Sequence, residues 1–292
     1  MKNSILYNSM IMLLLFAISL NVYVMINPAP SINQFEEDLK SEIEQEIIEE
    51  EKNEVQVNEE KEQELPNCPA FRDALSAYEY ASKILATQKN LYVAGFGSVS
   101  AAGGLGNQSI KTIKKIDDSG NIYCESVSKK AGMFGVNVAE ATLYKNDGYI
   151  LKNNTKDISD SLVANYSGTY QKVSVDSYLK DYKLLPWERS YDINASSISQ
   201  SSITFNGKVF KCSMILNKSA VARYGEKIKK SSDAKSLPNF SSITVNFTID
   251  IKGRFVSFSS SDSYVIDLGV SASVSQNLTE TYYYKKVVID EV

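Results

Sequence analysis

Most of the chain after residue 90 alternates hydrophobic and polar residues with a period of two, which is the pattern of β-strands. The clearest stretch runs from 243 to 251, where Thr, Asn, Thr and Asp separate the apolar residues Ile243, Val245, Phe247, Ile249 and Ile251. Side chains two positions apart in a strand lie on the same face, so these five point one way into apolar surroundings. The pattern predicts a strand with one buried and one solvated face.

The same alternation recurs between clusters of turn residues and predicts roughly ten strands in total. The others cover residues 91–100, 108–116, 121–128, 136–144, 149–152, 209–216, 255–259, 264–268 and 270–285, with one more beginning near Tyr191. Asn206-Gly207 predicts a two-residue hairpin turn in which both residues have positive φ. Neighbouring hairpins of this kind form an antiparallel meander.

Three segments have helical spacing instead and cover residues 71–88, 175–185 and 218–230. In the first, Phe71, Leu75, Tyr78 and Leu85 fall on one face. Pro186 ends the second, because the residue before a proline is biased away from helical geometry. Few helices among many antiparallel strands indicate an α+β fold that is mainly antiparallel β.

The N-terminal part of the chain differs in composition, because it contains a long uncharged, apolar segment. Residues 10–26 are uncharged, and these seventeen positions are at the lower limit for crossing a bilayer as a helix. No small-residue cleavage site follows, which favours an uncleaved signal anchor over a removed signal peptide. Lys2 precedes the segment and acidic residues follow it, so residues 1–9 form a short cytosolic N-terminus. We therefore expect a single-pass protein of the cell membrane whose C-terminal domain is extracytoplasmic.

Residues 27–65 are predicted to form an acidic stalk, disordered or partly helical. From Glu36 to Glu64 there are 14 acidic residues against three lysines, a net charge of −11. Such a segment repels itself and extends. Apolar residues at four-residue spacing from Phe35 to Ile47 are also compatible with a short coiled coil, which stays an alternative. The remaining domain, residues 66–292, has a net charge of +6, too small to imply nucleic-acid binding. We expect a monomer.

Three segments of the domain carry a family resemblance: Asn90–Gly97, Asp118–Tyr123 and Thr248–Phe255. With the order of predicted elements, they make residues 70–285 similar to the LolA-like half-barrel family of lipoprotein carriers. The resemblance implies a curved antiparallel sheet wrapped around helices, whose concave apolar face binds acyl chains or is filled by its own side chains. On this basis the candidate ligand-binding residues are Val245, Phe247, Ile249, Phe210 and Met214.

Candidate chemistry is sparse. The chain has no His, which removes Ser-His and Cys-His nucleophile pairs and the commonest metal ligand. We assign no catalytic, cofactor-binding or metal-binding residue. The three cysteines, Cys68, Cys124 and Cys212, leave two arrangements open: small buried thiols, or one disulfide with Cys124 and Cys212 as the candidate pair.

These observations favour a non-enzymatic, membrane-anchored binding or interaction protein, with a lipid, a lipoprotein or an envelope component as its partner. Two alternatives stay open. One is a structural surface protein whose concave face is packed shut. The other is an envelope hydrolase that uses a pair of carboxylates, since glycosidic cleavage needs no His.

Overall fold

The structure, a computed structural model, describes residues 69–101, 106–131, 137–155, 157–232, 234–269 and 271–289. All of them belong to the second of the chain's two units, Gln63–Val292. The predicted segments 1–9, 10–26 and 27–65 lie outside the described residues, as does Cys68. Within the described part, no helix is long and apolar enough to span a membrane.

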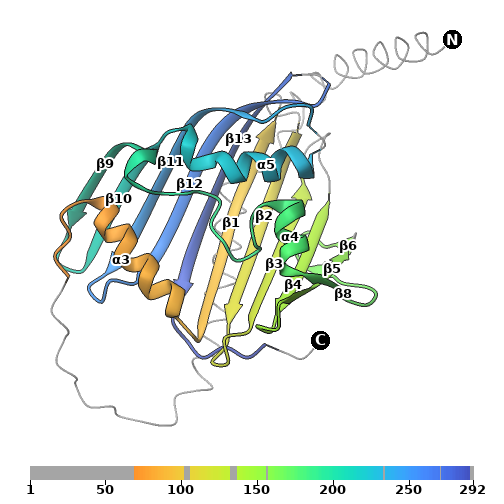
Figure 1. The fold of residues 1–292 in the computed structure, drawn as a ribbon, viewed down its shortest axis with the longest axis horizontal. Coiled ribbons are helices and arrows are strands. Elements are labelled where there is room, and N and C mark those ends of the chain that lie inside the picture. The colour runs from red at the N-terminus through yellow and green to blue at the C-terminus, as the bar shows by residue number, and fades with distance from the viewer. Residues whose placement is uncertain are drawn as a thin grey trace. The chain divides into compact units, whose positions relative to one another are not determined.

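Eleven strands form one antiparallel sheet in the order β8-β5-β4-β3-β2-β1-β13-β12-β11-β10-β9 (Figure 1). The first half is a meander of β1 (Leu91–Ala101), β2 (Gly106–Ile116), β3 (Ile122–Lys130), β4 (Val138–Tyr144) and β5 (Tyr149–Thr155), extended by β8 (Gln171–Ser174). The second is a meander of β9 (Ile198–Phe205), β10 (Val209–Leu216), β11 (Asn239–Asp250), β12 (Phe255–Asp267) and β13 (Ser271–Tyr283). Strand β13 pairs with β1 and joins the halves, while β8 and β9 remain as edges. The sheet is therefore curved but not closed.

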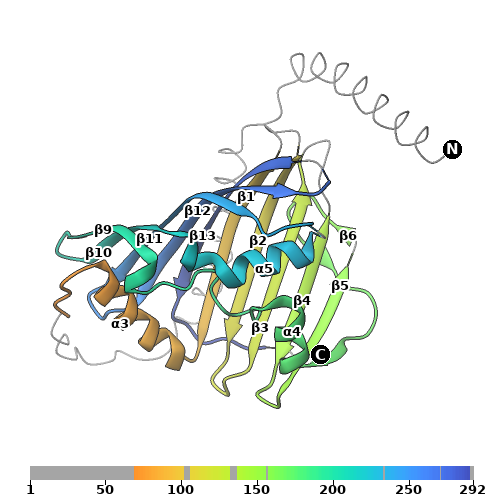
Figure 2. The same ribbon diagram turned by 45° about the horizontal axis from the view of Figure 1, so that its top comes forward.

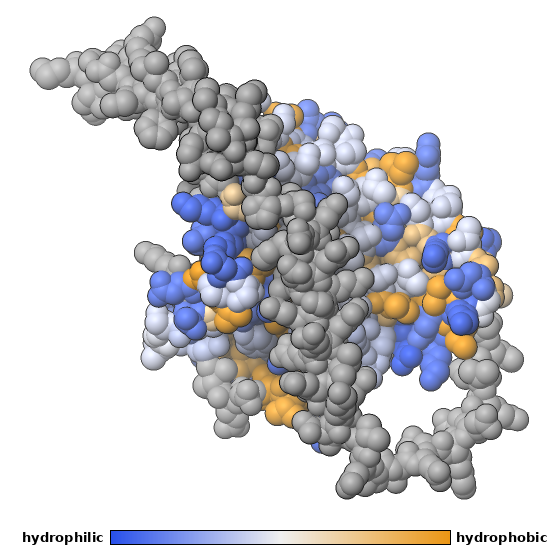
Figure 3. All heavy atoms as spheres, turned by 180° about the vertical axis from the view of Figure 1, so that it is seen from behind, coloured by the Kyte–Doolittle hydropathy of each residue, from blue (hydrophilic) through white to orange (hydrophobic). Residues whose placement is uncertain are grey.

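Three α-helices lie on one face of this sheet, which we call the inner face (Figures 1 and 2). They are α3 (Ala74–Thr87), α4 (Val175–Tyr182) and α5 (Ala222–Ser231), accompanied by 3₁₀ turns at Ala195–Ser197 and Lys218–Val221. Figure 3 shows the opposite, outer face, where hydrophilic and neutral side chains surround scattered apolar patches. A separate pair of short strands, β6 (Asp157–Ile158) and β7 (Ala164–Asn165), completes the described elements.

The largest hydrophobic core covers the half of the inner face formed by β9 to β13 and the start of β1, and α3, α5 and the 3₁₀ turn at Lys218–Val221 pack on it. Helix α3 begins at Asp73, whose carboxylate accepts the Ser76 backbone N–H at 2.8 Å, and so starts later than the predicted residue 71. Its fully buried residues are alanines at 74, 77 and 81, which allow the helix to approach the sheet closely. The Tyr78 ring then meets Phe247 edge to face at 5.8 Å. This half of the inner face is closed by packed side chains.

The predicted antiparallel α+β fold is confirmed, and most predicted strands match observed ones. The strands β6, β7 and β8 were not predicted, and α4 ends at Tyr182, before Pro186, because Lys183 takes the left-handed conformation. The segments 255–259 and 264–268 belong to one continuous strand, β12. The strand expected near Tyr191 begins only at Ile198, because the Tyr191 side chain turns into the interior and bonds to another strand. At Asn206-Gly207 only the glycine has positive φ; the Asn206 side chain instead accepts the backbone N–H of Val209 at 2.9 Å.

Candidate functional site

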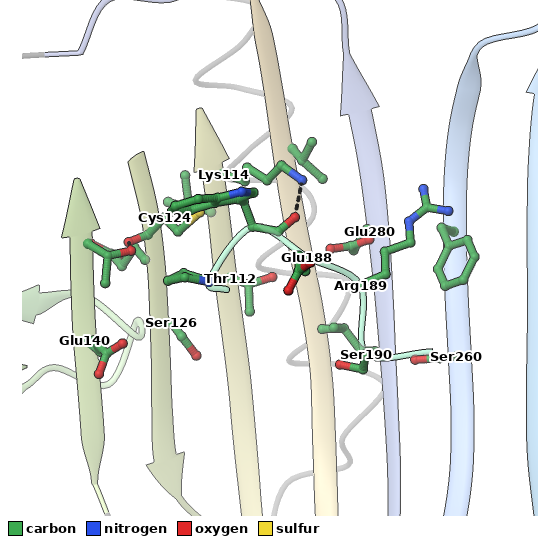
Figure 4. Close-up of a pocket in the computed structure, with 18 of the residues that line it drawn as sticks. Thr112, Lys114, Cys124, Ser126, Glu140, Glu188, Arg189, Ser190, Ser260 and Glu280 are labelled. Atoms are coloured by element: carbon green, nitrogen blue, oxygen red, sulfur yellow. Dashed lines mark hydrogen bonds between the residues drawn. The ribbon is translucent and has the colours of Figure 1, made fainter. Parts of the chain in front are cut away.

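A segment between α4 and the first 3₁₀ turn, residues 183–194, crosses the inner face, and we call it the strap (Figure 1). It begins where Lys183, in the left-handed conformation at φ 64°, ends α4. The Lys114 Nζ on β2 donates to the Trp187 carbonyl oxygen at 2.9 Å, as drawn in Figure 4. The Trp187 ring stacks on Tyr144 of β4 with 4.8 Å between centroids. These contacts hold the first part of the strap against β2 and β4.

Arg189 attaches the middle of the strap to the other half of the sheet. Its guanidinium lies over the rings of Phe255 and Phe258, 4.1 and 4.3 Å from their centroids. Nη2 donates to the Tyr282 hydroxyl at 3.1 Å. Nη1 is buried and has no hydrogen-bond partner among the described residues. A buried donor without an acceptor is costly, so Nη1 is a group that a bound molecule could satisfy.

The end of the strap is fixed by a buried carboxylate. Tyr191 donates its hydroxyl to Asp262 Oδ2 at 2.6 Å, and Gln276 Nε2 donates to the same oxygen at 2.8 Å. Asp262 is only 1% exposed, and burial raises the pKa of its carboxyl although both hydrogen bonds act to lower it. Its Oδ1 has no described partner. The strap is therefore bonded to β2, β12 and β13.

Below the strap lies a cavity of about 220 Å³, which we call the inner cavity. Its floor comes from the sheet between β4 and β12, and its roof from the strap, Tyr178 of α4 and Lys227 of α5. Apolar walls are supplied by Val93, Phe258, Leu278 and the Trp187 side of the strap. A second hollow of about 680 Å³ lies between the strap and α3 and shares the lining residues Lys114, Trp187, Glu188, Arg189 and Tyr191. The strap thus separates two adjoining spaces.

Strand register creates the floor of the inner cavity. Glu140, Ser126, Thr112, Gly95 and Glu280 are successive partners across β4, β3, β2, β1 and β13 and therefore form one row on the inner face (Figure 4). Gly95 contributes no side chain to this row. A Cβ added there would lie 2.1 Å from Thr112 Oγ1, so only glycine leaves Thr112 its place and the floor open.

The carboxylates at the two ends of the row already have partners. Glu140 forms an ion pair with Lys152 at 2.6 Å and accepts the Tyr178 hydroxyl at 3.1 Å. Glu280 accepts the Tyr282 hydroxyl at 2.8 Å. Burial raises the pKa of the Tyr178 and Tyr282 hydroxyls, which therefore stay protonated and act as donors.

The cations of the inner cavity have fewer partners. Lys227 projects from α5 with no hydrogen bond or ion pair to any described residue, and Lys114 bonds only to the strap carbonyl. Burial lowers the pKa of both ammonium groups. Both lie near the Cys124 thiol, whose own pKa is raised to about 12 by burial. A thiol with that pKa stays protonated at neutral pH and is a poor nucleophile.

The structure places the five candidate ligand-binding residues elsewhere. Val245, Phe247, Ile249, Phe210 and Met214 are all buried in the hydrophobic core, and none lines the inner cavity or the α3 hollow. Ligand binding by these residues stays a prediction, but in this structure their space is occupied by neighbouring side chains.

The candidate disulfide is not formed. Cys124 and Cys212 are both free and buried. They lie on β3 and β10, and five strands stand between these two in the sheet. The buried-thiol arrangement is the one found for this pair.

Sequence reasoning missed the polar residues of the inner cavity. The strands of Lys114 and Glu280 do not alternate clearly between apolar and polar residues, so neither residue stands out as an inward-facing polar group. Lys227 belongs to a basic run that looks like the solvated end of a helix. The available signal was Trp187, the single tryptophan of the chain, which directly follows Pro186 in a polar connection. Among the described residues, no group of His, Cys, Asp and Glu side chains could hold a metal ion.

Comparison with known proteins gives no family. No family model and no curated protein matches the sequence. Among solved structures, a beta-barrel-like protein of the domain of unknown function DUF1849 from Brucella abortus overlaps 67% of this chain and 99% of its own at 8% identity and a TM-score of 0.22. An inactive mutant of the CurK dehydratase overlaps 72% of this chain and 83% of its own at 13% identity and a TM-score of 0.14. The structure of MucB in complex with MucA(peri) covers 72% of this chain and 99% of its own chain, at 7% identity and a TM-score of 0.14.

Proposed function

We propose that the protein is a non-catalytic binding protein, anchored in the cell membrane by residues 10–26 with its half-barrel outside the cytoplasm. The inner cavity takes the polar end of its ligand, and the ligand class is a lipid or the lipid-modified part of a lipoprotein. The resemblance to LolA-like carriers supports this class. The site differs from the one inferred from sequence, because the apolar half of the inner face is filled.

One observation carries the proposal: the inner cavity is covered on one side by a strap that the fold holds in place, yet a buried donor of the strap lacks a partner. The Arg189 Nη1 is buried without an acceptor among the described residues. Lys227 makes no hydrogen bond or ion pair to a described residue, but it is only partly buried and interacts electrostatically with Glu140. Buried polar groups are normally satisfied, so unmet donors in a lined cavity favour a bound molecule.

The arrangement of carboxylates favours binding over hydrolysis. Glu140 and Glu280 are four strand spacings apart, on the order of 19 Å along the sheet. Carboxylate pairs that cleave glycosides are about 5 to 10 Å apart. Glu188, the strap carboxylate, pairs with Arg223 at 3.4 Å. None of these pairs resembles a free acid and base facing each other.

Native mass spectrometry of the full chain purified from its own host tests the proposal. We expect a co-purifying small molecule that the Ser126→Phe variant loses, because Ser126 lines the inner cavity. Ser273→Phe, exposed on β13, is the matched control and should retain it. If the purified chain carries nothing and takes up nothing from a lipid extract of the host, the proposal fails and the structural-protein alternative is preferred.

A further inference from the structure

We propose that the inner cavity selects its ligand through an oxyanion, a carboxylate or phosphate group, held between Lys227 of α5 and Lys114 of β2. The inference rests on the proposed binding function and specifies the chemistry of the ligand's polar end. It is carried by the donors and acceptors that line the inner cavity.

The donors are in excess. Lys227 enters the cavity from the roof with all three of its N–H groups unpaired among the described residues, and Lys114 uses one of its three on the Trp187 carbonyl. Arg189 adds the buried Nη1 at the strap. Lys114 and Lys227 both line this one cavity, Lys114 from the floor and Lys227 from the roof.

The two cavity carboxylates differ in how far they are compensated. Glu140 is paired with Lys152 and accepts the Tyr178 hydroxyl. Glu280 accepts the Tyr282 hydroxyl and has no ion-pair partner among the described residues, so the β13 end of the floor keeps a negative charge and the oxyanion must lie away from it, toward the lysines. A neutral headgroup could accept hydrogen bonds from the two lysines but would bring no opposite charge, and a cationic one would be repelled. An oxyanion supplies several acceptor oxygens and the opposite charge.

The space suits a small headgroup with a short apolar continuation. A volume of about 220 Å³ corresponds to roughly seven water molecules at liquid density. Val93, Leu278 and Phe258 provide apolar walls beside the lysines. The adjoining α3 hollow, which shares Lys114 and Trp187 with the inner cavity, gives a longer chain somewhere to continue.

Trp187 makes the test direct, because it is the only tryptophan of the chain and lines both spaces. The full chain, in a neutral sugar-headed detergent where its N-terminal segment requires one, is titrated with six-carbon probes while Trp187 fluorescence is followed. The probes are hexanoate, hexyl phosphate, hexanol and hexylammonium. Inorganic phosphate and acetate are two further probes that lack the long alkyl chain. They distinguish a free anion from an amphiphile as the source of the oxyanion.

We expect saturable binding of hexanoate or hexyl phosphate and at least about tenfold weaker binding by Lys227→Met, the loss expected for a hydrogen-bonded charge. Lys230→Met, an exposed lysine on the same helix, is the matched control and should bind like the parent. Lys114→Met should also weaken binding, whereas Lys115→Met, its neighbour on the outer face of β2, should not. Circular dichroism checks each fold, and Lys227→Gln replaces a variant that does not fold.

Two results overturn the inference while leaving the binding function standing: hexanol binding as tightly as the anions, or Lys227→Met and Lys114→Met both binding them as the parent does. If no probe binds but a host molecule co-purifies, the oxyanion chemistry is wrong and the cavity serves another ligand. If neither probes nor host molecules bind, the proposed function itself fails. Binding of inorganic phosphate as tight as that of hexyl phosphate supports the oxyanion site but contradicts the lipid class of the proposed function, because it assigns a free anion to the site.

Discussion

Substitution of Phe247 tests whether the apolar half of the inner face is a closed core or an open groove. Its ring is 2% exposed and lies within 5.8 Å of the Tyr78 and Phe255 rings and 6.2 Å of the Phe258 ring, measured between centroids. Phe247→Ala removes this ring from beneath α3 and leaves a cavity among rigid neighbours. Phe247→Leu keeps most of the volume.

The expected loss follows from burial. A buried aromatic ring removes about 200 Å² from water, worth about 5 kcal/mol at 25 cal/mol per Å², and the alanine retains part of that. Measured Phe→Ala substitutions in cores cost about 3–5 kcal/mol, and we expect Phe247→Ala to lower the free energy of unfolding by this amount. Phe247→Leu should cost less than about 1.5 kcal/mol, since it nearly conserves volume.

Urea unfolding of the parent and variants, followed by circular dichroism, measures these differences. Asn246→Ala is the control, because Asn246 is exposed on the outer face of the same strand and its loss should change stability by less than about 0.5 kcal/mol. A Phe247→Ala variant that loses under about 1 kcal/mol would refute the closed core and restore the ligand groove inferred from sequence.

Three further predictions concern the cavity floor, the strap and the buried thiols. Gly95→Ala should destabilise the fold in thermal melts through its clash with Thr112 Oγ1, and adding Thr112→Ala should recover most of the loss; an unrecovered double variant would mean that the backbone causes the strain. The pKa of the Asp262 carboxyl is higher in the folded state than the value near 3.8 of the unfolded state. The protonated carboxyl therefore contributes its full stability below the unfolded-state pKa, and this contribution is lost as the pH rises through the folded-state pKa. The parent should therefore gain stability relative to Asp262→Asn as the pH of urea titrations falls from about 7 to 4, and a constant difference would contradict the assignment. Cys124 and Cys212 should resist iodoacetamide in the native chain and react after denaturation, as peptide masses would show; rapid native alkylation of either would contradict their burial.

The sequence was informative wherever one strand by itself sorts its side chains between two faces. Val245, Phe247 and Ile249 alternate with polar residues, and the structure buries all three. The helix at 74–87 was equally visible, because its apolar spacing and its cap are local. Such features need no knowledge of which strand pairs with which.

The inner cavity could not be predicted in this way. Lys114 faces inward because β2 pairs with β1 in a register that sets Lys114 opposite Val93, and a shift of one residue would turn it outward. The route of the strap depends on Tyr191 reaching Asp262, 71 positions later in the chain. Long-range pairings of this kind leave no periodic trace in a single sequence.

The pairing of β1 with β13 has a consequence for synthesis of the chain. Ser98 and Asn277, which bond across these strands, are 179 positions apart, so β1 leaves the ribosome long before its partner exists. Until then the nascent first meander presents the eleven residues of β1 as an open edge, to which another chain can add a strand. Contacts at such separations also slow folding. The β1 edge can therefore be covered by its own chain only once β13 is available, and until then the first meander is exposed to association with other chains.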